Sequence, residues 1–210
     1  MAIDAIAVIC GELGLQPTAA QAQALATYLD LLQRWNGTYN LTAVRDRQAM
    51  LTQHLADCLT AVRPLLSRVS KGRVLDVGSG GGLPGVVLAV LAPKLDVTCV
   101  DAVGKKAAFV RQVAGQLALP NLHTVHARVE TLSVAAFDVI TSRAFASLAN
   151  FTALTAQLLA PGGVWMAMKG KHPGDELAAL PACVAVFHVE QLQVPGLDVE
   201  RCLVWMRPAP

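Results

Sequence analysis

The stretch of sequence that decides the fold is Arg73-Val74-Leu75-Asp76-Val77-Gly78-Ser79-Gly80-Gly81-Gly82-Leu83-Pro84-Gly85. Its first five residues are mostly apolar and predict a buried strand, and a glycine-rich loop follows at once. A helix is predicted over Gly85–Leu91, with Pro84 near its first turn, where a missing N–H does no harm. Glycines let the backbone turn sharply and let a ligand approach without interference from Cβ atoms. A glycine loop that joins a parallel strand to a helix is where open α/β sheets bind ligands.

Short apolar runs alternate with helical stretches on the carboxyl side of this loop. The alternation predicts right-handed βαβ crossovers and a doubly wound, Rossmann-like α/β fold with a seven-stranded, mostly parallel sheet. Only the turn Pro195-Gly196 separates the last two strands, so we expect an antiparallel pair at the C-terminal end. The other predicted strands and helices are strands 97–100, 122–126, 139–142, 164–169, 184–194 and 202–207, and helices 105–117 and 148–159, the second stopped by Pro161-Gly162-Gly163.

The first seventy residues show no strand pattern and are predicted to be helical. Thr18 is the expected N-cap of a helix that runs to about Asn36 and is ended by Gly37. A second helical stretch is predicted from about Asp46 and stops at Pro64. We therefore expect two parts, which are an N-terminal helical extension over 1–70, packed on the core, and a ligand-binding domain over 71–210.

The composition fits a globular protein with a large core, because 54% of the 210 residues are hydrophobic and 15% are charged. Neither a run long enough to cross a bilayer nor a signal-peptide pattern is visible, so a cytoplasmic location is expected. The five cysteines are scattered without a Cys-x-x-Cys pair, which predicts buried, reduced thiols and no metal site. A net charge of +2 neither establishes nor excludes nucleic-acid binding, which would need a local basic patch.

Two acidic residues bear on the identity of the ligand. Gly80 to Gly85 satisfies the dinucleotide pattern G-x-G-x-x-G, which alone is a weak signal, and the loop on its own would also fit a simple tight turn. Asp76, two residues before Gly78, places a carboxylate that suits the α-ammonium group of S-adenosylmethionine and would repel a pyrophosphate. Asp101 ends the second strand and can accept hydrogen bonds from ribose hydroxyls of either cofactor. The pattern favours S-adenosylmethionine and leaves an NAD(P)-binding oxidoreductase open.

The end of the fourth strand, Ser142-Arg143-Ala144, bears on the methyl acceptor. Methylases of exocyclic amines carry a proline-aromatic motif at this point, and cytosine C5 methylases need a nucleophilic cysteine. Neither is present here, and Cys183 lies beyond the fifth strand, where we assign it to the core. We therefore expect an acceptor atom with a free lone pair, such as guanine N7. A methyltransferase of a small molecule or a protein remains an alternative.

Several separate motifs together resemble the RsmG (GidB) family, the bacterial 16S rRNA guanine-N7 methyltransferases. The resemblance runs over most of the chain and implies a class I methyltransferase that modifies guanine 527 (standard rRNA numbering) in the decoding-region hairpin. It also implies 16S rRNA or a precursor of the small ribosomal subunit as the partner, and we expect a monomer. The matching motifs are Trp35–Arg45, His54–Leu59, Asp76–Gly85, Ser142–Ala146 and Met168–Gly170.

The resemblance, together with the glycine loop, also implies the residues that bind S-adenosylmethionine. Four positions depart from the commoner family pattern: Leu83 stands for phenylalanine, Val129 for alanine, Cys58 for serine, and Gly37 for a basic residue. Only the last change removes a potential RNA contact. The expected cofactor-binding residues are Asp76, Gly78, Gly80, Gly82, Leu83, Asp101, Val129, Glu130 and Arg143.

Guanine N7 carries no proton, so its lone pair can attack the methyl carbon in line without a general base. The enzyme must chiefly hold the two reactants together in the right orientation. Arg143 is expected beside the transferred methyl group, in contact with the base or the cofactor carboxylate. Lys169 is expected to contact guanine O6 or a phosphate, although a solvated lysine is an equal alternative.

The remaining candidates concern RNA binding and the N-terminal motifs. His54 and Asp57 are interpreted as a structural hydrogen-bonded pair and not as metal ligands. Trp35 and Tyr39 are expected to pack the N-terminal helices on the sheet, with base stacking as the alternative. The residues expected to bind RNA are Arg45, Lys105, Lys106 and Lys171, while Arg111 and Arg128 are expected to be ordinary exposed charges.

Overall fold

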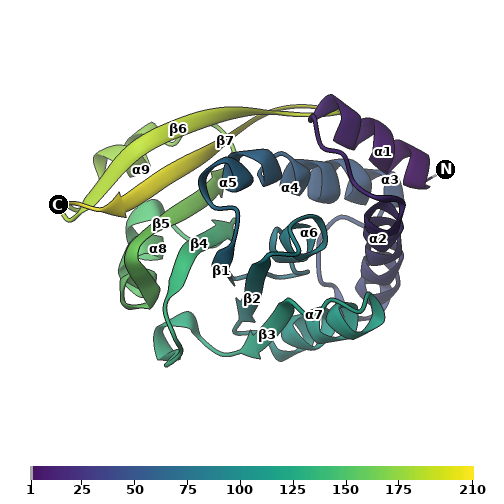
Figure 1. The fold of residues 1–210 in the computed structure, drawn as a ribbon, viewed down its shortest axis with the longest axis horizontal. Helices are drawn as coiled ribbons and strands as arrows, with labels where there is room; N and C mark the ends of the chain where they lie inside the picture. The colour runs from purple at the N-terminus through teal and green to yellow at the C-terminus, as the bar shows by residue number, and fades with distance from the viewer. Residues whose placement is uncertain (1) are drawn as a thin grey trace.

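One seven-stranded sheet organises the computed structural model, which describes residues 2–210 (Figure 1). The strand order is β3-β2-β1-β4-β5-β7-β6. The first five strands of this order are parallel, and β7 runs antiparallel to both β5 and β6, which confirms the predicted sheet. The strands are β1 Gly72–Val77, β2 Leu95–Asp101, β3 Leu122–His126, β4 Phe137–Arg143, β5 Leu159–Lys169, β6 Val184–Val194 and β7 Leu197–Pro208.

Helices cover both faces of the sheet. Two hydrophobic clusters fill the space between, one beneath α1, α2, α5, α6 and α7, the other chiefly beneath α8. In β4, Val139 packs in the first cluster and its neighbour Ile140 in the second, because successive side chains of a strand point to opposite faces. The helices are α1 Ala2–Glu12, α2 Ala19–Tyr39, α3 Arg47–Met50, α4 Asp57–Leu59, α5 Val62–Arg68, α6 Gly85–Leu91, α7 Gly104–Gln116, α8 Leu148–Thr155 and α9 Gly174–Ala178.

The helix α2 begins as predicted and ends later. The Thr18 hydroxyl accepts a hydrogen bond from the Gln21 N–H at 3.2 Å, and the Gln21 side chain accepts one from the Thr18 N–H at 2.9 Å. The predicted stop at Gly37 is wrong, because the helix continues to Tyr39. Asn40 ends it instead by adopting a left-handed conformation with φ of 50°, which is one of the standard ways to stop a helix.

The second N-terminal stretch is more irregular than the sequence predicts. Asp46 caps α3 as expected, since its carboxylate accepts a hydrogen bond from the Ala49 N–H at 2.8 Å. A π-helical segment, Leu51–Ala56, then leads into α4. Pro64 does not stop the helix, because it occupies the first turn of α5, where its missing N–H costs nothing. π-helical turns are often found at functional sites, and this one carries His54.

Several boundaries after the glycine loop also differ from the prediction; β7, for example, begins at Leu197 and not at Cys202. The helix predicted to reach Leu159 ends as α8 at Thr155, followed by a 3-10 turn over Ala156–Leu158. Pro161-Gly162-Gly163 lies inside β5 and not before it, because β5 pairs with β4 through an irregular register that accommodates Gly162 at φ of 77°. Among residues 2–210 no helix combines the length and the apolar character needed to cross a membrane.

Candidate functional site

The glycine loop between β1 and α6 is shaped by backbone geometry that glycine alone adopts easily. Gly78, Gly80 and Gly82 have φ values of 65°, 56° and 82°, in the left-handed region. The Gly78 and Ser79 N–H groups donate to the Val100 carbonyl at 2.9 and 3.2 Å, which fastens the loop to the end of β2. The turn that the sequence predicts therefore lies at the carboxyl edge of the parallel strands, where ligands bind in this class of fold.

Asp76 lies fully buried beneath this loop. Its Oδ2 accepts a hydrogen bond from the Gly85 N–H at 2.8 Å, while its Oδ1 has no partner among the described residues. Burial raises the pKa of this carboxyl to about 7, against the lowering effect of the Gly85 N–H bond and of the Arg143 charge. An unpaired buried oxygen is costly, and a cationic group held at the loop would stabilise the ionised form.

Asp101 stands at the end of β2 and braces the loop from the other side. Its Oδ2 accepts from the Gly80 N–H at 2.9 Å and its Oδ1 from the Val103 N–H at 2.8 Å. A carboxylate has about four lone-pair sites, so each oxygen retains the capacity to accept a further donor.

Two cavities lie on either side of Gly78. The Asp101 cavity, of about 200 Å³, is lined by Val77, Gly78, Val100, Asp101, Ala102, Ala127, Arg128, Val129, Glu130, Phe145 and Leu154. The His54 cavity, of about 190 Å³, is lined by Leu32, Leu41, Thr42, His54, Gly78, Ser79, Gly80, Gly81, Leu83, Lys106, Arg143 and Ala144. The Phe145 ring lies directly on Gly78, where a Cβ atom would come within 2.6 Å of the ring. The ring therefore lines the Asp101 cavity and packs on the glycine that the two cavities share.

Most of the predicted cofactor residues line one of these two cavities. Gly78, Asp101, Val129 and Glu130 line the first, and Gly78, Gly80, Leu83 and Arg143 line the second. Asp76 and Gly82 line neither. Asp76 lies under the loop, and the position of a Cβ on Gly82 is filled by the side chain of Val86.

A third cavity, of about 260 Å³, adjoins the second at Arg143 and Ala144, which line both. We call it the Arg201 cavity. Asp57 is 3% exposed and divides its carboxylate between two guanidinium groups: Arg143 Nη1 lies 3.2 Å from Oδ2 and Arg201 Nε lies 2.9 Å from Oδ1. The lining residues are Asp57, Arg143, Ala144, Met168, Lys169, Gly170 and Arg201.

Known proteins match almost the whole length of the chain. The sequence profile of the family "rRNA small subunit methyltransferase G" (GidB) matches residues 21–204. The chain belongs to this family. It is 61% identical to the ribosomal RNA small subunit methyltransferase G of Acidovorax ebreus over 206 residues, which cover 93% of this chain and 91% of the relative. The protein of the same name from Bordetella avium is 56% identical over 201 residues, covering 94% and 90%.

Solved structures show the same fold at low sequence identity. The crystal structure of TrmN from Thermus thermophilus matches with a TM-score of 0.59 and 21% identity, over 72% of this chain and 49% of that chain. A 1,6-didemethyltoxoflavin-N1-methyltransferase from Burkholderia thailandensis, solved with S-adenosylhomocysteine bound, matches with a TM-score of 0.58 and 18% identity over 93% of both chains. This member of the GidB family thus has the Rossmann-like fold of S-adenosylmethionine-dependent methyltransferases.

In this family member, His54 and Asp57 do not form the direct hydrogen-bonded pair that we expected. The His54 Nε2 lies 2.7 Å from the Thr42 hydroxyl, and its Nδ1 lies 3.5 Å from Arg143 Nη1. Burial, followed by the charge of Arg143, lowers the pKa of His54, so the neutral ring is favoured. Both residues therefore contact Arg143 Nη1, His54 from the π-helical segment and Asp57 from the start of α4.

Lys169, at the end of β5, is engaged by the protein itself. Its Nζ lies 2.8 Å from Glu176 Oε2 and donates to the Ala146 carbonyl at 2.9 Å. The alternative of a fully solvated lysine is therefore wrong. Lys169 still lines the Arg201 cavity, together with Arg143.

The residues predicted to bind RNA lie on loops and helix ends at this edge of the sheet. Lys106 lines the His54 cavity, and Lys105 precedes it, exposed, in the first turn of α7. Arg45 is exposed between α2 and α3 and donates to Asn40 Oδ1 at 3.0 Å, and Lys171 is exposed after β5. The structure thus brings at least Lys106 to the same cavity as Arg143.

Trp35 packs against the core as expected, whereas Tyr39 is 43% exposed and contacts the Trp35 ring at the surface. The Trp35 ring lies 5.0 Å from the Tyr39 ring and 5.5 Å from the Phe109 ring of α7, measured between centroids. Four of the five cysteines are buried, but Cys183 is exposed, so its assignment to the core is wrong. It lies in the turn before β6, which is the edge strand of the sheet. Among residues 2–210, no group of three or more His, Cys, Asp or Glu is arranged to hold a metal ion.

Arg201 is the residue that sequence reasoning missed. The predicted last strand began at Cys202, and no local motif marks the arginine before it. Only the antiparallel pairing of β7 with β5, in which Cys202 faces Lys169, brings Arg201 to the carboxyl edge of the parallel strands.

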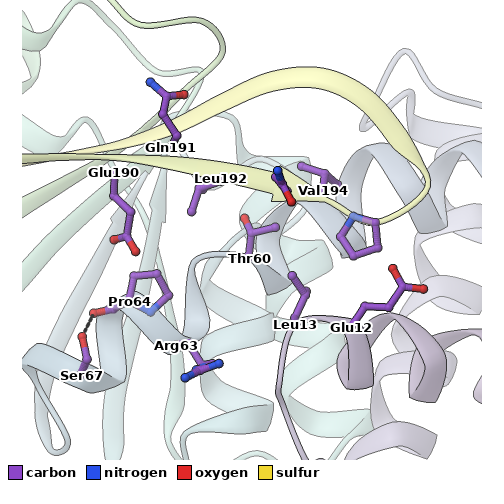
Figure 2. A pocket seen from close by; sticks show the side chains of 12 residues that line it. Glu12, Leu13, Thr60, Arg63, Pro64, Ser67, Glu190, Gln191, Leu192 and Val194 are labelled. Carbon is purple, nitrogen blue, oxygen red and sulfur yellow. Dashed lines mark hydrogen bonds between the residues drawn. The ribbon is translucent and has the colours of Figure 1, made fainter.

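A larger cavity, of about 770 Å³, shares no lining residue with the Asp101, His54 and Arg201 cavities (Figure 2). It is formed where the β6–β7 hairpin spans α5 and the end of α1, with Glu190 directed toward α5 and Gln191 directed away from it (Figure 2). None of the predicted site residues lines it. Its size reflects the span of the hairpin, and the candidate functional site comprises the three smaller cavities.

Proposed function

We propose that this protein transfers a methyl group from S-adenosylmethionine to guanine N7 at position 527 of 16S rRNA. The observation that carries the proposal is the adjoining arrangement of the three cavities, in a chain of the small-subunit methyltransferase G family. The first two cavities share the glycine loop, and the third opens beside Arg143 at the end of β4. This is the order in which a two-part cofactor and its acceptor would lie.

The loop region suits S-adenosylmethionine. The spare lone pairs of Asp101 would accept the ribose hydroxyls, and Val129 and Glu130 would lie along the adenosine. The methionine end would occupy the His54 cavity, where Arg143 supplies a positive charge for its carboxylate. The unpaired Oδ1 of Asp76 favours a cationic group above the loop. When bound, the cofactor supplies a methyl group on a positively charged sulfur.

The acceptor would be held in the Arg201 cavity by residues that bind and orient it. A guanine N7 has a lone pair and no proton to lose, so positioning is the main requirement. Asp57 is engaged by two guanidinium groups and His54 by Thr42 and Arg143, which leaves neither free to act as a general base. Arg143 and Lys169 are the proposed positioning groups at the reacting atoms.

The cations around the site, of which Lys106 is half-buried and the others are exposed, would bind the phosphates of the RNA. Arg45, Lys105, Lys106 and Lys171 stand on loops and helix ends at the carboxyl edge of the sheet. Because phosphate contacts release counterions, RNA binding through them is expected to weaken steeply with salt.

Methyl incorporation from labelled S-adenosylmethionine tests the proposal. The acceptors are 16S rRNA, presented naked and as 30S subunits from a strain that lacks the modification, and the modified base is then mapped. We expect incorporation at guanine 527 into at least one of the two. Incorporation into neither would contradict the proposal and would favour a small-molecule or protein acceptor. Preferential binding of NAD(P)H over S-adenosylmethionine would favour an oxidoreductase.

A further inference from the structure

The Arg201 cavity has features that go beyond holding a base in place. We propose that Arg201 reads O6 of the acceptor purine, and that Asp57 is the positioning residue that aims both Arg201 and Arg143. The proposal rests on the proposed function, because it concerns the same acceptor. It assigns a specificity-determining role to a residue of β7 outside the predicted site.

Arg201 is held in one orientation and keeps donors to spare. Its Nε donates to Asp57 Oδ1 at 2.9 Å, and its Nη1 donates to the Glu200 carbonyl at 2.9 Å. Its Nη2 has no hydrogen-bond partner among the described residues, although the side chain is only 27% exposed. A guanidinium group is a rigid fork, so fixing one side of it also fixes the direction of the remaining N–H groups.

Asp57 is a structural anchor and is not available as an acceptor for the base. Each of its two oxygens already accepts from a different guanidinium group, and the residue is 3% exposed. Lys169 is likewise paired with Glu176. The side-chain polar groups that line the cavity therefore offer donors, because the only anion among them is already engaged by Arg143 and Arg201.

A cavity lined by donors distinguishes guanine from adenine. On the edge of a purine that carries N7, guanine presents the acceptor O6, whereas adenine presents an amino donor. A purine whose N7 faces the junction of the cavities at Arg143 and Ala144 presents this neighbouring group to the wall that Arg201 lines. Guanine O6 can accept from the free N–H groups of Arg201. The amino group of adenine would instead face these donors with another donor, which is strongly disfavoured.

A phosphate contact is the competing role for Arg201, because a guanidinium group also binds phosphates. The two roles differ in what they depend on. Reading of O6 depends on the base and on the fork geometry of arginine. A phosphate contact is indifferent to the base, and a lysine can largely fulfil it.

The experiment compares two acceptors that differ at position 6. The 16S rRNA, in the form that the wild-type protein methylates, carries either guanine or 2-aminopurine at the acceptor position. 2-Aminopurine is introduced by ligation of a synthetic segment; it keeps N7 and the 2-amino group and lacks O6. Single-turnover rates are measured for the wild type, Arg201→Met, Arg201→Lys and Asp57→Asn. Arg207→Met, in the same strand but outside all three cavities, is the matched control.

We expect the wild type to prefer guanine, and Arg201→Met to slow guanine methylation by about ten- to hundredfold, the worth of one charged hydrogen bond. The rate with 2-aminopurine should change little, so the ratio of the guanine rate to the 2-aminopurine rate falls toward one. Arg201→Lys and Asp57→Asn should also lower the ratio of the guanine rate to the 2-aminopurine rate. Binding of S-adenosylhomocysteine and the melting temperature are measured for each variant to distinguish a loss of recognition from misfolding. The Arg207→Met control should keep the wild-type ratio.

Three results would overturn the inference while leaving the proposed function intact. These are an equal rate of the wild type on both acceptors, an equal slowing of both by Arg201→Met, and full rescue by lysine, which would indicate a phosphate contact. A wild-type protein that methylates the guanine acceptor neither in naked 16S rRNA nor in 30S subunits would overturn the proposed function, and this inference with it.

Discussion

Asp76 combines complete burial with one hydrogen bond to the Gly85 N–H and one unpaired oxygen. The acid was predicted from its place before the glycines, but its burial was not, because a residue at a strand end can face either the ligand or the core. Arg143 shows the same dependence on surroundings. Its position after β4 was predicted, whereas its partners Asp57 and His54 come from a segment almost ninety residues earlier in the chain.

The first prediction concerns the pH dependence of folding through Asp76. The pKa of this carboxyl is about 7 in the folded protein and 3.8 in its unperturbed state, so the folded state holds the proton more tightly. Its contribution to stability is full below about pH 4 and is lost as the pH rises to about 7. Replacing Asp76 with asparagine removes this loss. Urea unfolding at pH 5 and pH 8 should show a smaller fall in unfolding free energy for the variant, by on the order of a few kcal/mol. An identical fall in both proteins would contradict the burial argument.

The second prediction concerns Arg143→Lys. Arg143 Nη1 makes the contacts with Asp57 and His54, which leaves the other N–H groups of the guanidinium for a ligand; lysine keeps the charge beside Asp57 but has a single nitrogen for both tasks. We expect kcat to fall by roughly a hundredfold with a much smaller change in the melting temperature. Steady-state methylation and thermal unfolding measure both, with Arg207→Lys as the control. A raised KM with unchanged kcat would mean that Arg143 contributes only to ground-state binding.

At the scale of elements, the positions of strands and glycine turns were predictable, and several helix ends were not. Asn40 ends α2 in place of Gly37, and Pro64 lies inside α5, because capping geometry and tertiary contacts override the local signal. The loop from β4 to α8 matters most for function. It places Ala144 at φ of 56° and packs the Phe145 ring on Gly78, the glycine that lines both the Asp101 and the His54 cavities.

The third prediction follows from this loop. We expect a ligand that spans the Asp101 and His54 cavities across Gly78 to displace the Phe145 ring, which packs on that glycine. Phe145→Trp should therefore change its fluorescence when S-adenosylhomocysteine is added. Phe187→Trp, in β6 and 36% exposed, should show no such change. Calorimetry on the same samples establishes that the ligand is bound, and bound ligand without a fluorescence change would refute the displacement.

At the scale of the whole molecule, the site exists because the sheet brings together segments far apart in the chain (Figure 1). Asp57 comes from α4, Arg143 from β4 and Arg201 from β7. The N-terminal helices thus take part in the site as well as in the core that they share with the sheet. The cations at this edge also come from different segments of the chain, and a polyanion would contact several of them at once.

The fourth prediction concerns this basic edge. Replacing Lys105 and Lys106 with glutamine should weaken RNA binding and reduce the slope of log affinity against log salt by about one unit for each phosphate that the variant no longer neutralises. Filter binding over a range of salt concentrations measures both. Lys94→Gln, exposed before β2 at the opposite edge of the sheet, should leave the slope unchanged. Equal effects of both changes would mean that the edge has no special role.

The sequence by itself determined the fold class and the cofactor loop, because both depend on local patterns: the alternation of strands and helices, and glycines where the backbone must be left-handed. Motifs spread along the chain also indicated the family to which it belongs. The tertiary structure alone decided the surroundings of these residues: the burial of Asp76, the pairing of Lys169 with Glu176, and the placement of Arg201 beside Asp57. Such contacts depend on strand order and register, which bring together residues that are far apart in the chain. The sequence on either side of each residue therefore does not indicate them.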